Sequence, residues 1–323
     1  MKKPLVVIVS PAVAAANNGN WQTAWRWSRL LGAGFRTRIV KDWQAGQDAD
    51  AVAMLALHAR RSAASIQAWA RAHPERGLAV VLTGTDLYRD IQTDPAAQRS
   101  LALAQRLVVL QERGPDALPE VFRGKTRVIF QSTTRRQPLA KSSRHLRALM
   151  VGHLREEKSP QTLFEAARLL QSRPDIRIDH IGAALDPALG ALARQTAAQC
   201  PNYRWLGGLA HEATRRRIQR AHVLVHASRM EGGAHVLMEA VCSGTPVLAS
   251  RVDGNVGMLG VDYQGYFEWG DSAALTRLLL RCREDASFFS GLRAQCRLRA
   301  PLFQPEAERA ALFHLLTELT KNP

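Results

Sequence analysis

Two glutamates, Glu231 and Glu239, stand eight positions apart, and Gly232 and Gly233 directly follow the first of them. A run typical of a β-strand precedes this group, and a helix-like run follows it and ends at Gly244. Glycines in such a turn let backbone N–H groups approach an anion, and a helix N-terminus adds about half a positive charge. A carboxylate beside that anion would accept hydrogen bonds from hydroxyls attached to it. Two carboxylates flanking a diphosphate indicate a ligand with hydroxyls at both ends, which describes a nucleotide sugar.

Two basic residues, Arg155 and Lys158, lie in a loop that also follows a β-type run, and Ser159 and Pro160 then favour the start of a helix. Both basic side chains could reach the diphosphate that the glycine turn faces, and a pair of solvated surface charges is the alternative. Glu239 lies inside an apolar run, which favours a buried carboxylate with partners over an ordinary helix-forming glutamate.

The first half of the chain offers two loops with polar residues after strand-like runs. Residues 17–20, Asn-Asn-Gly-Asn, favour a turn but lack the G-x-G-x-x-G spacing of a nicotinamide-dinucleotide site. Residues 83–86, Thr-Gly-Thr-Asp, combine hydroxyls and backbone N–H groups that suit a compact oxyanion, with a capped turn as the alternative. The candidate residues on this side are Asn18, Gly19, Asn20, Thr83, Gly84, Thr85 and Asp86.

Two weaker candidates lie in the second half. Gly207 follows a strand-like run and could face a flat base, or it could form a plain turn. Residues 253–257, Asp-Gly-Asn-Val-Gly, follow another such run; their flexible backbone could contact phosphate or sugar, and a surface loop is the default prediction.

Short β-type runs alternate with helical runs along the chain, which predicts parallel sheets built from βαβ units. Residues 133–145 break this rhythm, because they are rich in Thr, Ser, Arg and Gln and lack an apolar period, so they form the predicted linker. We therefore expect two doubly wound α/β domains, 1–145 and 146–300, and a terminal helical segment, 301–323. Ligands of such sheets bind beyond the carboxyl ends of the strands, so we expect the site in a cleft between the domains. The expected strands are Leu5–Ser10, Arg36–Lys41, Ala51–Leu57, Leu78–Gly84, Leu107–Gln111, Thr126–Gln131, Leu146–Val151, Ile176–Ile181, Tyr203–Leu206, His222–Ala227 and Val247–Ser250.

The chain has 323 residues, 46% of them hydrophobic, and a formal net charge of +16. That charge fits nucleic acid, an anionic membrane or small anionic substrates. Its spread along the chain, with no basic tail and no aromatic-basic motif, argues against nucleic acid. No apolar run reaches the roughly 18 residues of a membrane span, so stable membrane insertion is not expected. The four cysteines are scattered, which fits a reducing cytoplasm and predicts no metal site.

Residues 151–158 and 231–239 together resemble the donor half of the retaining glycosyltransferases of family 4, which have the GT-B fold. His153 stands where that family commonly has arginine, and Ser159 where it has glycine. The first departure leaves the implied phosphate clamp one permanent charge lighter. Residues 302–319 resemble the terminal helix that crosses back onto the first domain in this fold.

The resemblance, which covers about residues 146–300, also implies roles for individual residues. Arg155 and Lys158 would neutralise a leaving diphosphate, and Glu231 would face the transferred sugar. Glu239 would bind the ribose hydroxyls. The implied donor-binding residues are Gly232, Gly233, Glu239, Gly207 and His153.

Residues 17–27 and 83–90, in a chain this short, are similar to the selenosugar synthases of selenoneine biosynthesis. That similarity implies transfer of GlcNAc or glucose from a UDP-sugar to selenophosphate, which gives a 1-selenosugar, UDP and phosphate without a metal cofactor. One alternative is a GT-B enzyme with a lipid or other hydroxyl acceptor, whose Trp-rich segment 21–27 faces a membrane surface. Another is a non-catalytic binder of nucleotide sugars or nucleic acid. The residue patterns indicate no particular oligomeric state.

Overall fold

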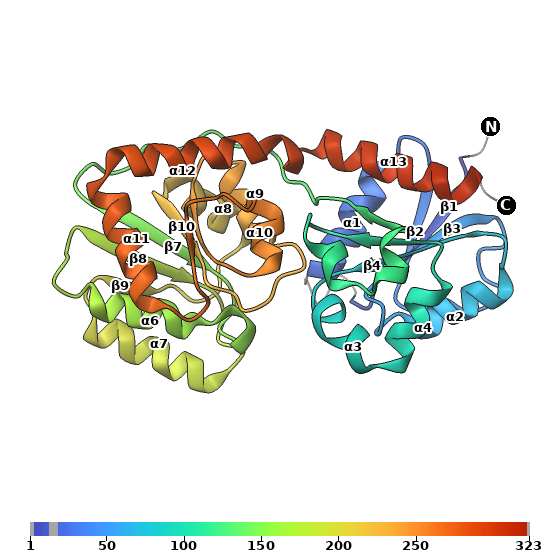
Figure 1. The fold of residues 1–323 in the computed structure, drawn as a ribbon, viewed down its shortest axis with the longest axis horizontal. Coiled ribbons are helices and arrows are strands. Elements are labelled where there is room, and N and C mark those ends of the chain that lie inside the picture. Colours follow the sequence, from blue (N-terminus) through green and yellow to red (C-terminus); the bar gives the residue numbers. More distant parts are fainter. Residues whose placement is uncertain (1–2, 13–18, 322–323) are drawn as a thin grey trace. The chain divides into compact units, whose positions relative to one another are not determined.

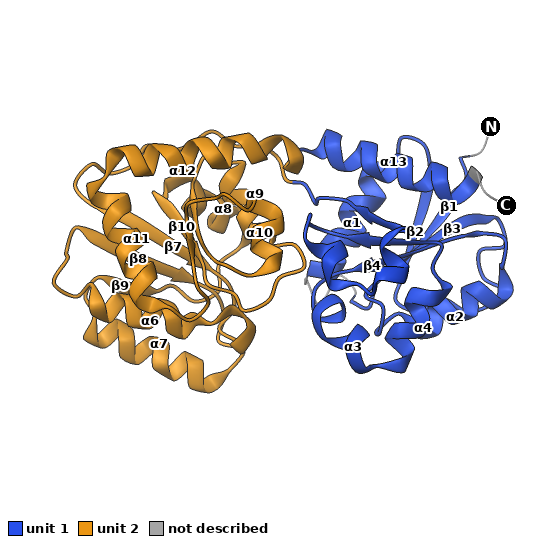
Figure 2. Cartoon of the chain, in the orientation of Figure 1, with its two compact units in different colours: residues 1–132, 304–323 blue, residues 133–303 orange. Residues whose placement is uncertain are grey.

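The computed structural model describes residues 3–12 and 19–321 and divides into two compact units (Figure 1). Unit 1 comprises residues 1–132 and 304–323, and unit 2 comprises residues 133–303 (Figure 2). Each unit contains one six-stranded sheet in which every strand pair is parallel. The predicted α/β architecture with two doubly wound sheets is therefore confirmed.

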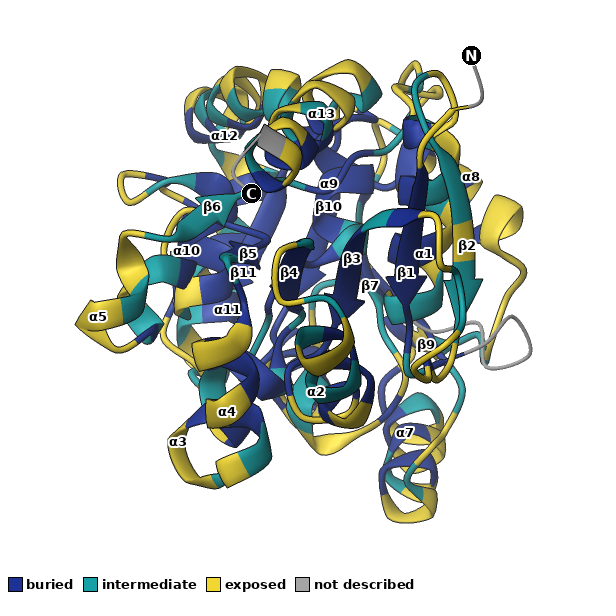
Figure 3. Ribbon diagram, turned by 90° about the vertical axis from the view of Figure 1, so that its right-hand side faces the viewer, coloured by how far each residue is buried: buried dark blue, intermediate teal, exposed yellow. Residues whose placement is uncertain are grey.

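The strands of unit 1 are β1 (Leu5–Val9), β2 (Arg36–Val40), β3 (Ala51–Leu57), β4 (Gly77–Leu82), β5 (Arg106–Val109) and β6 (Thr126–Val128). Their order in the sheet is β2-β1-β3-β4-β5-β6. Strands β1, β3 and β4 are almost wholly apolar and buried (Figure 3), as expected for a parallel sheet covered on both faces. Alternate residues face opposite layers, so that Val7 and Val9 belong to one core cluster and Val6 and Ile8 to the other.

The helices of unit 1 are α1 (Gly19–Leu31), α2 (Ala63–Ala72), α3 (Ile91–Thr93), α4 (Pro95–Leu103), α5 (Glu120–Arg123) and α13 (Pro305–Lys321), with the short turns η2 (Asp86–Asp90) and η3 (Gly114–Ala117). Helices α2 and α4 contribute to one core cluster, and α1 and α13 contribute to the other. Buried Glu308 fastens α13 to α1, because its carboxylate accepts hydrogen bonds from Arg26 Nε at 2.8 Å and Trp27 Nε1 at 2.6 Å. The last helix of the chain thus completes unit 1.

The strands of unit 2 are β7 (Leu146–Val151), β8 (Ile176–Ile181), β9 (Tyr203–Trp205), β10 (Val223–His226), β11 (Val247–Ser250) and β12 (Tyr266–Phe267), in the order β12-β11-β10-β7-β8-β9. Its helices are α6 (Pro160–Leu169), α7 (Pro187–Gln199), α8 (His211–Arg220), α9 (His235–Val241), α10 (Asp253–Leu259), α11 (Ser272–Glu284) and α12 (Ala286–Arg299), with the short turns η4 (Glu156–Lys158) and η5 (Ala300–Phe303). The sequence did not predict β12, which is only two residues long.

Two segments of unit 2 differ from the sequence-based expectation. Residues 133–145 are irregular as predicted, but they are part of unit 2 and not of the first domain, in which the predicted boundary at 145 placed them. Their backbone bonds to that unit, since the Arg136 N–H donates to the Cys242 carbonyl at 3.0 Å. Residues 253–257 form the start of α10 and not a surface loop, and the Asn255 side chain is fully buried.

Each sheet has one point where the strand order reverses direction. In unit 2 this point lies between β7 and β10, and in unit 1 it lies between β1 and β3. Doubly wound sheets bind ligands in the crevice outside the carboxyl ends of the strands at such a point. The loops that follow these four strands are therefore the places to look for chemistry. Within the described residues, no helix is both long and apolar enough to cross a membrane.

Candidate functional site

The loops that follow β7 and β10 meet at the carboxyl edge of the unit 2 sheet. The Lys158 ammonium lies 2.5 Å from Glu231 Oε1, and the two side chains are only 17% and 10% exposed. The backbones also join, because the Arg229 N–H donates to the Glu157 carbonyl at 2.9 Å. The basic stretch and the glycine turn, 73 positions apart in sequence, thus converge as expected.

A histidine completes the surroundings of Glu231. His226, the last residue of β10, is buried and places Nε2 3.1 Å from the same Oε1 atom. Burial opposes ionisation of this carboxyl, but Lys158 and His226 outweigh it and hold the pKa of Glu231 well below its usual range. Glu231 is therefore ionised at neutral pH. A diphosphate that approached Lys158 would share this cation with Glu231.

Two glycines allow backbone segments to touch at this edge. A Cβ atom on Gly254 would lie 1.9 Å from the Glu231 carbonyl oxygen, and one on Gly182 would lie 1.9 Å from the Gly152 carbonyl oxygen. The Gly182 N–H donates to the Gly207 carbonyl at 2.8 Å, which brings the loops after β7, β8 and β9 into contact. Only glycine fits at these two close contacts. The contacts let α10 lie against the Glu231 turn and let the loop after β8 lie against the loop after β7.

The glycine turn itself keeps two backbone donors available. Within the part of the chain that the structure describes, the N–H groups of Gly232 and Gly233 donate to no protein acceptor. Helix α9, which follows, has seven residues and is shorter than the predicted run. Gly244 beyond it has a φ of +69°, the left-handed conformation predicted for its glycine stop.

The second carboxylate, Glu239, is buried on α9. Its Oε1 atom lies 2.7 Å from His211 Nε2 and 3.4 Å from Arg215 Nη1, so the expectation that it needs partners is met. The hydrogen bond to Glu239 raises the pKa of His211. Arg215 is itself buried and also donates to Thr133 Oγ1 at 2.5 Å. Both contacts to Glu239 fall on Oε1, and Oε2 has no partner among the described residues.

The other implied phosphate ligands are less constrained. Arg155 is exposed, and its Nε lies 3.8 Å from the Glu157 carboxylate rather than beside Glu231. His153 is exposed as well, and its Nδ1 accepts a hydrogen bond from the Ala183 N–H at 3.1 Å. Partial burial and then the charges of Arg155 and Lys158 lower the pKa of His153. Gly207 has a φ of +68° and is half-buried.

Ser159 shows what its departure from glycine means. Its φ of +46° and ψ of +52° lie in the left-handed region, which glycine adopts most readily. Ser159 and Pro160 hold the predicted N-cap and N1 positions of α6, but the Ser159 side chain makes no capping hydrogen bond. The hydroxyl instead accepts a hydrogen bond from Trp269 Nε1 at 2.8 Å.

In unit 1, the loop 83–86 follows β4 and binds its own carboxylate. Asp86 is fully buried, and its Oδ1 accepts hydrogen bonds from the Thr83 and Gly84 N–H groups at 2.9 and 3.0 Å. Its Oδ2 accepts a third from the Ala59 N–H at 2.9 Å. The Thr83 and Gly84 N–H groups that were expected to face an oxyanion therefore bind Asp86 instead. Thr85 holds the N-cap position of η2, but its side chain makes no capping hydrogen bond.

The remaining candidates of unit 1 fall into two groups. Asn18 lies outside the described residues. Gly19 and Asn20 are the first two residues of α1. Thr85 is half-buried, and its hydroxyl lies 3.2 Å from His58 Nε2, which links it to the loop after β3.

Sequence reasoning missed three of the partners of the two glutamates, which are His226, His211 and Arg215. His226 ends the strand-like run that leads to the glycine turn, so its position at a carboxyl edge was a usable signal. Arg215 had none, because α8 carries four arginines and only the fold decides which of them is buried.

Comparison with known proteins places this arrangement in a family. The family model described as glycosyl transferases group 1 matches residues 131–297, just over half of the chain. No curated protein matches the sequence. The sucrose-phosphate synthase of Thermosynechococcus elongatus has a similar structure, with a TM-score of 0.77 and 17% identity over 99% of this chain and 100% of its own.

Two more solved structures extend the likeness. Anabaena HepE, solved with UDP and glucose, gives a TM-score of 0.74 and 14% identity over 98% of this chain and 100% of its own. TarM of S. aureus, solved with UDP, gives a TM-score of 0.66 and 12% identity over 82% of this chain, which covers 55% of the length of TarM. At such identities the likeness shows only the shared fold, which is the GT-B fold of two α/β domains that each contain a parallel sheet. With the family match over the Lys158 and Glu231 loops, this chain belongs to the group 1 glycosyl transferases and is a GT-B glycosyltransferase.

Proposed function

We propose that the chain transfers a sugar from a UDP-sugar to selenophosphate, as a retaining enzyme of family 4. The observation that carries the donor half is the largely buried pair of Lys158 and Glu231 at the strand reversal of unit 2. It lies beside two backbone amides that have no protein acceptor among the described residues. HepE and the pneumococcal O-GlcNAc transferase GtfA, which share the fold, were solved with UDP. The acceptor half rests on the similarity of residues 17–27 and 83–90 to selenosugar synthases.

The donor would bind across the carboxyl edge of unit 2. Lys158 and the Gly232 and Gly233 amides would face the diphosphate, where negative charge grows as the sugar leaves. Glu239 would accept hydrogen bonds from the ribose hydroxyls on Oε2, while His211 and Arg215 hold its other oxygen. This arrangement lets a buried carboxylate stay paired and still bind a ligand.

Glu231 would lie beside the transferred sugar. Its ionised carboxylate stabilises the positive charge that develops at C1 as the bond to the diphosphate weakens. Arg155 is exposed, and its Nε lies 3.8 Å from the Glu157 carboxylate, so its side chain could turn to the outer phosphate oxygens. His153 and Gly207 would line the diphosphate and the base.

The chemistry needs two bond exchanges. First the selenium of selenophosphate bonds to C1, and the C1–O bond breaks with its electron pair leaving on UDP. Water then attacks phosphorus and the P–Se bond breaks, so that the electron pair stays on selenium and phosphate is released. The products are a 1-selenosugar, UDP and phosphate. Selenium enters as an anion and needs no protein base for the first step.

The test is to incubate the protein with UDP-GlcNAc or UDP-glucose, with and without selenophosphate, and to identify the products by mass. We expect a selenosugar and UDP only when both substrates are present. Transfer to a lipid or other hydroxyl acceptor instead would contradict the acceptor assignment, and no consumption of either UDP-sugar would contradict the donor assignment.

A matched pair of variants tests the site itself. We expect Lys158→Ala to lower turnover by about 100- to 1,000-fold, as for loss of one well-placed electrostatic donor. Arg168→Ala removes a cation from an ion pair on the neighbouring helix α6 and should leave turnover unchanged. Equal activity of the two variants would remove Lys158 from the reaction.

A further inference from the structure

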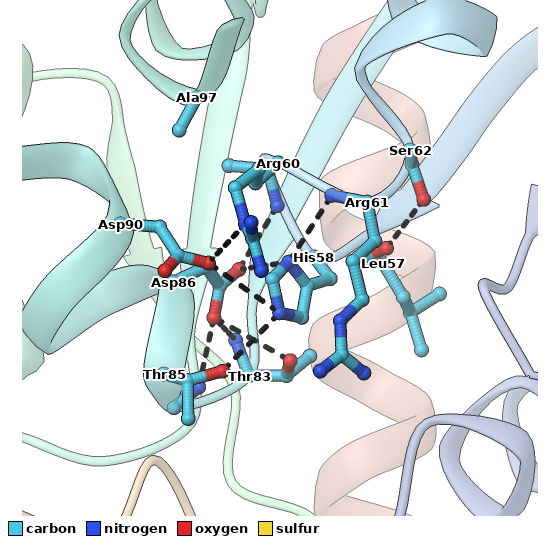
Figure 4. A network of polar contacts seen from close by, with 12 residues as sticks. Leu57, His58, Arg60, Arg61, Ser62, Thr83, Thr85, Asp86, Asp90 and Ala97 are labelled. Atoms are coloured by element: carbon cyan, nitrogen blue, oxygen red, sulfur yellow. Dashed lines mark hydrogen bonds and ion pairs between the residues drawn. The ribbon is translucent and has the colours of Figure 1, made fainter. Parts of the chain in front are cut away.

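A polar cluster with a buried centre of His58, Asp86 and Asp90 joins the carboxyl ends of β3 and β4 in unit 1 (Figure 4). We call it the His58 cluster, and its members are His58, Arg60, Arg61, Thr85, Asp86 and Asp90. His58 directly follows β3, next to the strand reversal of this sheet, and is only 2% exposed. Its φ of +73° is unusual for a residue other than glycine, and strain of this kind concentrates at functional sites.

The hydrogen bonds of His58 fix the direction in which Thr85 can donate. The Arg61 N–H points to His58 Nδ1 at 3.4 Å, so Nδ1 is an acceptor and the proton resides on Nε2. Nε2 then donates to Thr85 Oγ1 at 3.2 Å. Burial, which outweighs the attraction of Asp86, lowers the pKa of His58 and keeps this neutral form. A hydroxyl that already accepts a hydrogen bond has its own proton left for another partner.

The charges of the cluster divide into paired and unpaired groups. Asp86 is used by three backbone donors, as described above. Asp90 accepts from Arg60 Nε at 2.9 Å and lies 3.3 Å from Arg89 Nε. Arg61, by contrast, has no carboxylate within 4.0 Å among the described residues, and it is exposed. In Figure 4 its side chain lies on the other side of His58 from the two aspartates.

We propose that Arg61 and the Thr85 hydroxyl bind the phosphoryl oxygens of an anionic acceptor, and that His58 is a positioning residue that orients this hydroxyl. A guanidinium presents two parallel N–H donors that match a phosphoryl group, and a hydroxyl supplies a third donor. The side chains of Arg61 and Thr85 would then bind the anion in place of the backbone N–H groups that were predicted to do so at residues 83–86. The identity of the anion as the acceptor rests on the proposed function, whereas the site itself does not.

Binding can be measured without turnover by using inorganic thiophosphate, a stable anion similar in shape and charge to selenophosphate. We expect wild-type protein to bind thiophosphate and Arg61→Ala to bind it about 10- to 100-fold more weakly, as for loss of a charge-assisted contact. Arg61→Lys should recover part of the affinity, because it keeps the charge but loses the fork. Arg71→Ala, which removes an exposed cation in the last turn of α2, is the matched control and should bind thiophosphate as wild type does.

The role of His58 needs a readout beyond stability. Thr85→Val should weaken thiophosphate binding and raise the acceptor KM, and Thr85→Ser should restore both. His58→Asn tolerates a left-handed backbone but lacks the Nε2 donor, so we expect it to raise the acceptor KM about fivefold or more while the affinity for UDP stays at the wild-type value.

The outcomes separate the two proposals. Transfer to selenophosphate with unchanged thiophosphate affinity in Arg61→Ala would overturn the site and leave the proposed function standing. Thiophosphate binding that depends on Arg61, in a protein that transfers sugar only to hydroxyls, would keep the anion site and overturn the proposed acceptor. No measurable binding of thiophosphate by wild-type protein would also overturn the site.

Discussion

The ion pair between Lys158 and Glu231 should be worth far more than an ordinary surface pair. At 2.5 Å the Coulomb attraction of two unit charges is about 7 kcal/mol at an effective dielectric constant near 20. Desolvation of both groups cancels most of it, and His226 remains as a second partner of the carboxylate. We expect a net coupling energy of about 2 kcal/mol, within the range measured for residues in one network.

A double-mutant cycle measures this coupling. Its members are Lys158→Met, Glu231→Gln and the double variant, and the readout is the unfolding free energy of unit 2 from hydrogen exchange of the β7 and β10 amides. Following amides of one unit avoids treating a chain of two units as a single transition. The Glu165–Arg168 pair on α6 is the control, because its side chains are 49% and 34% exposed and its coupling should stay below about 0.5 kcal/mol. A coupling for Lys158 and Glu231 no larger than that of the control would refute the reasoning.

Three further predictions concern the surrounding residues. Glu239→Gln should weaken UDP binding by about tenfold in calorimetry and should lower the pKa of His211 in NMR titrations, and unchanged affinity and titration would contradict the ribose role. Because the pKa of His211 is raised in the folded state, its pairing with Glu239 stabilises the protein below about pH 6.5, and this stabilisation is lost as the pH rises through the folded-state pKa. Gly254→Ala should destabilise unit 2 by about 2 kcal/mol or more and lower turnover, since the added Cβ would clash with the Glu231 carbonyl. A variant with the melting temperature and activity of the wild type would show that the backbone shifts here at little cost. Ser159→Ala should be less stable than Ser159→Gly by about 1 kcal/mol in unfolding free energy, because both variants lose the hydroxyl contact but only alanine keeps the cost of the left-handed backbone. Equal midpoints in denaturant would argue against that strain.

Much of the fold could be read from the sequence, because buried parallel strands are short, continuous apolar runs. The strands at 51–57, 146–151, 176–181 and 247–250 have the predicted bounds to the residue. Strand β12 was missed because two residues carry no pattern. Residues 253–257 were predicted as a loop on the strength of two glycines, and the reason for one of them, close approach to the Glu231 carbonyl, is a long-range contact that no local pattern reveals.

The candidate site divides in the same way. The meeting of the Lys158 and Glu231 loops followed from topology, since both loops leave the carboxyl ends of strands that became neighbours in one sheet. Whether a carboxylate faces a ligand or folds back depends on distant backbone. Asp86 folds back partly because the Ala59 N–H, 27 positions away, reaches it. His58 was missed because a single histidine after a strand-like run carries no pattern, and its left-handed backbone is seen only in the structure.

In our proposal, the loops after β7 and β10 together bind the diphosphate of a sugar nucleotide. Hydrogen exchange with and without UDP tests it most directly, because it reports on each loop separately. We expect UDP to slow exchange of the amides at 152–158 and 231–239 together, and Lys158→Ala to reduce that protection. Bound UDP that protects only one of the two loops, or neither, would contradict the account.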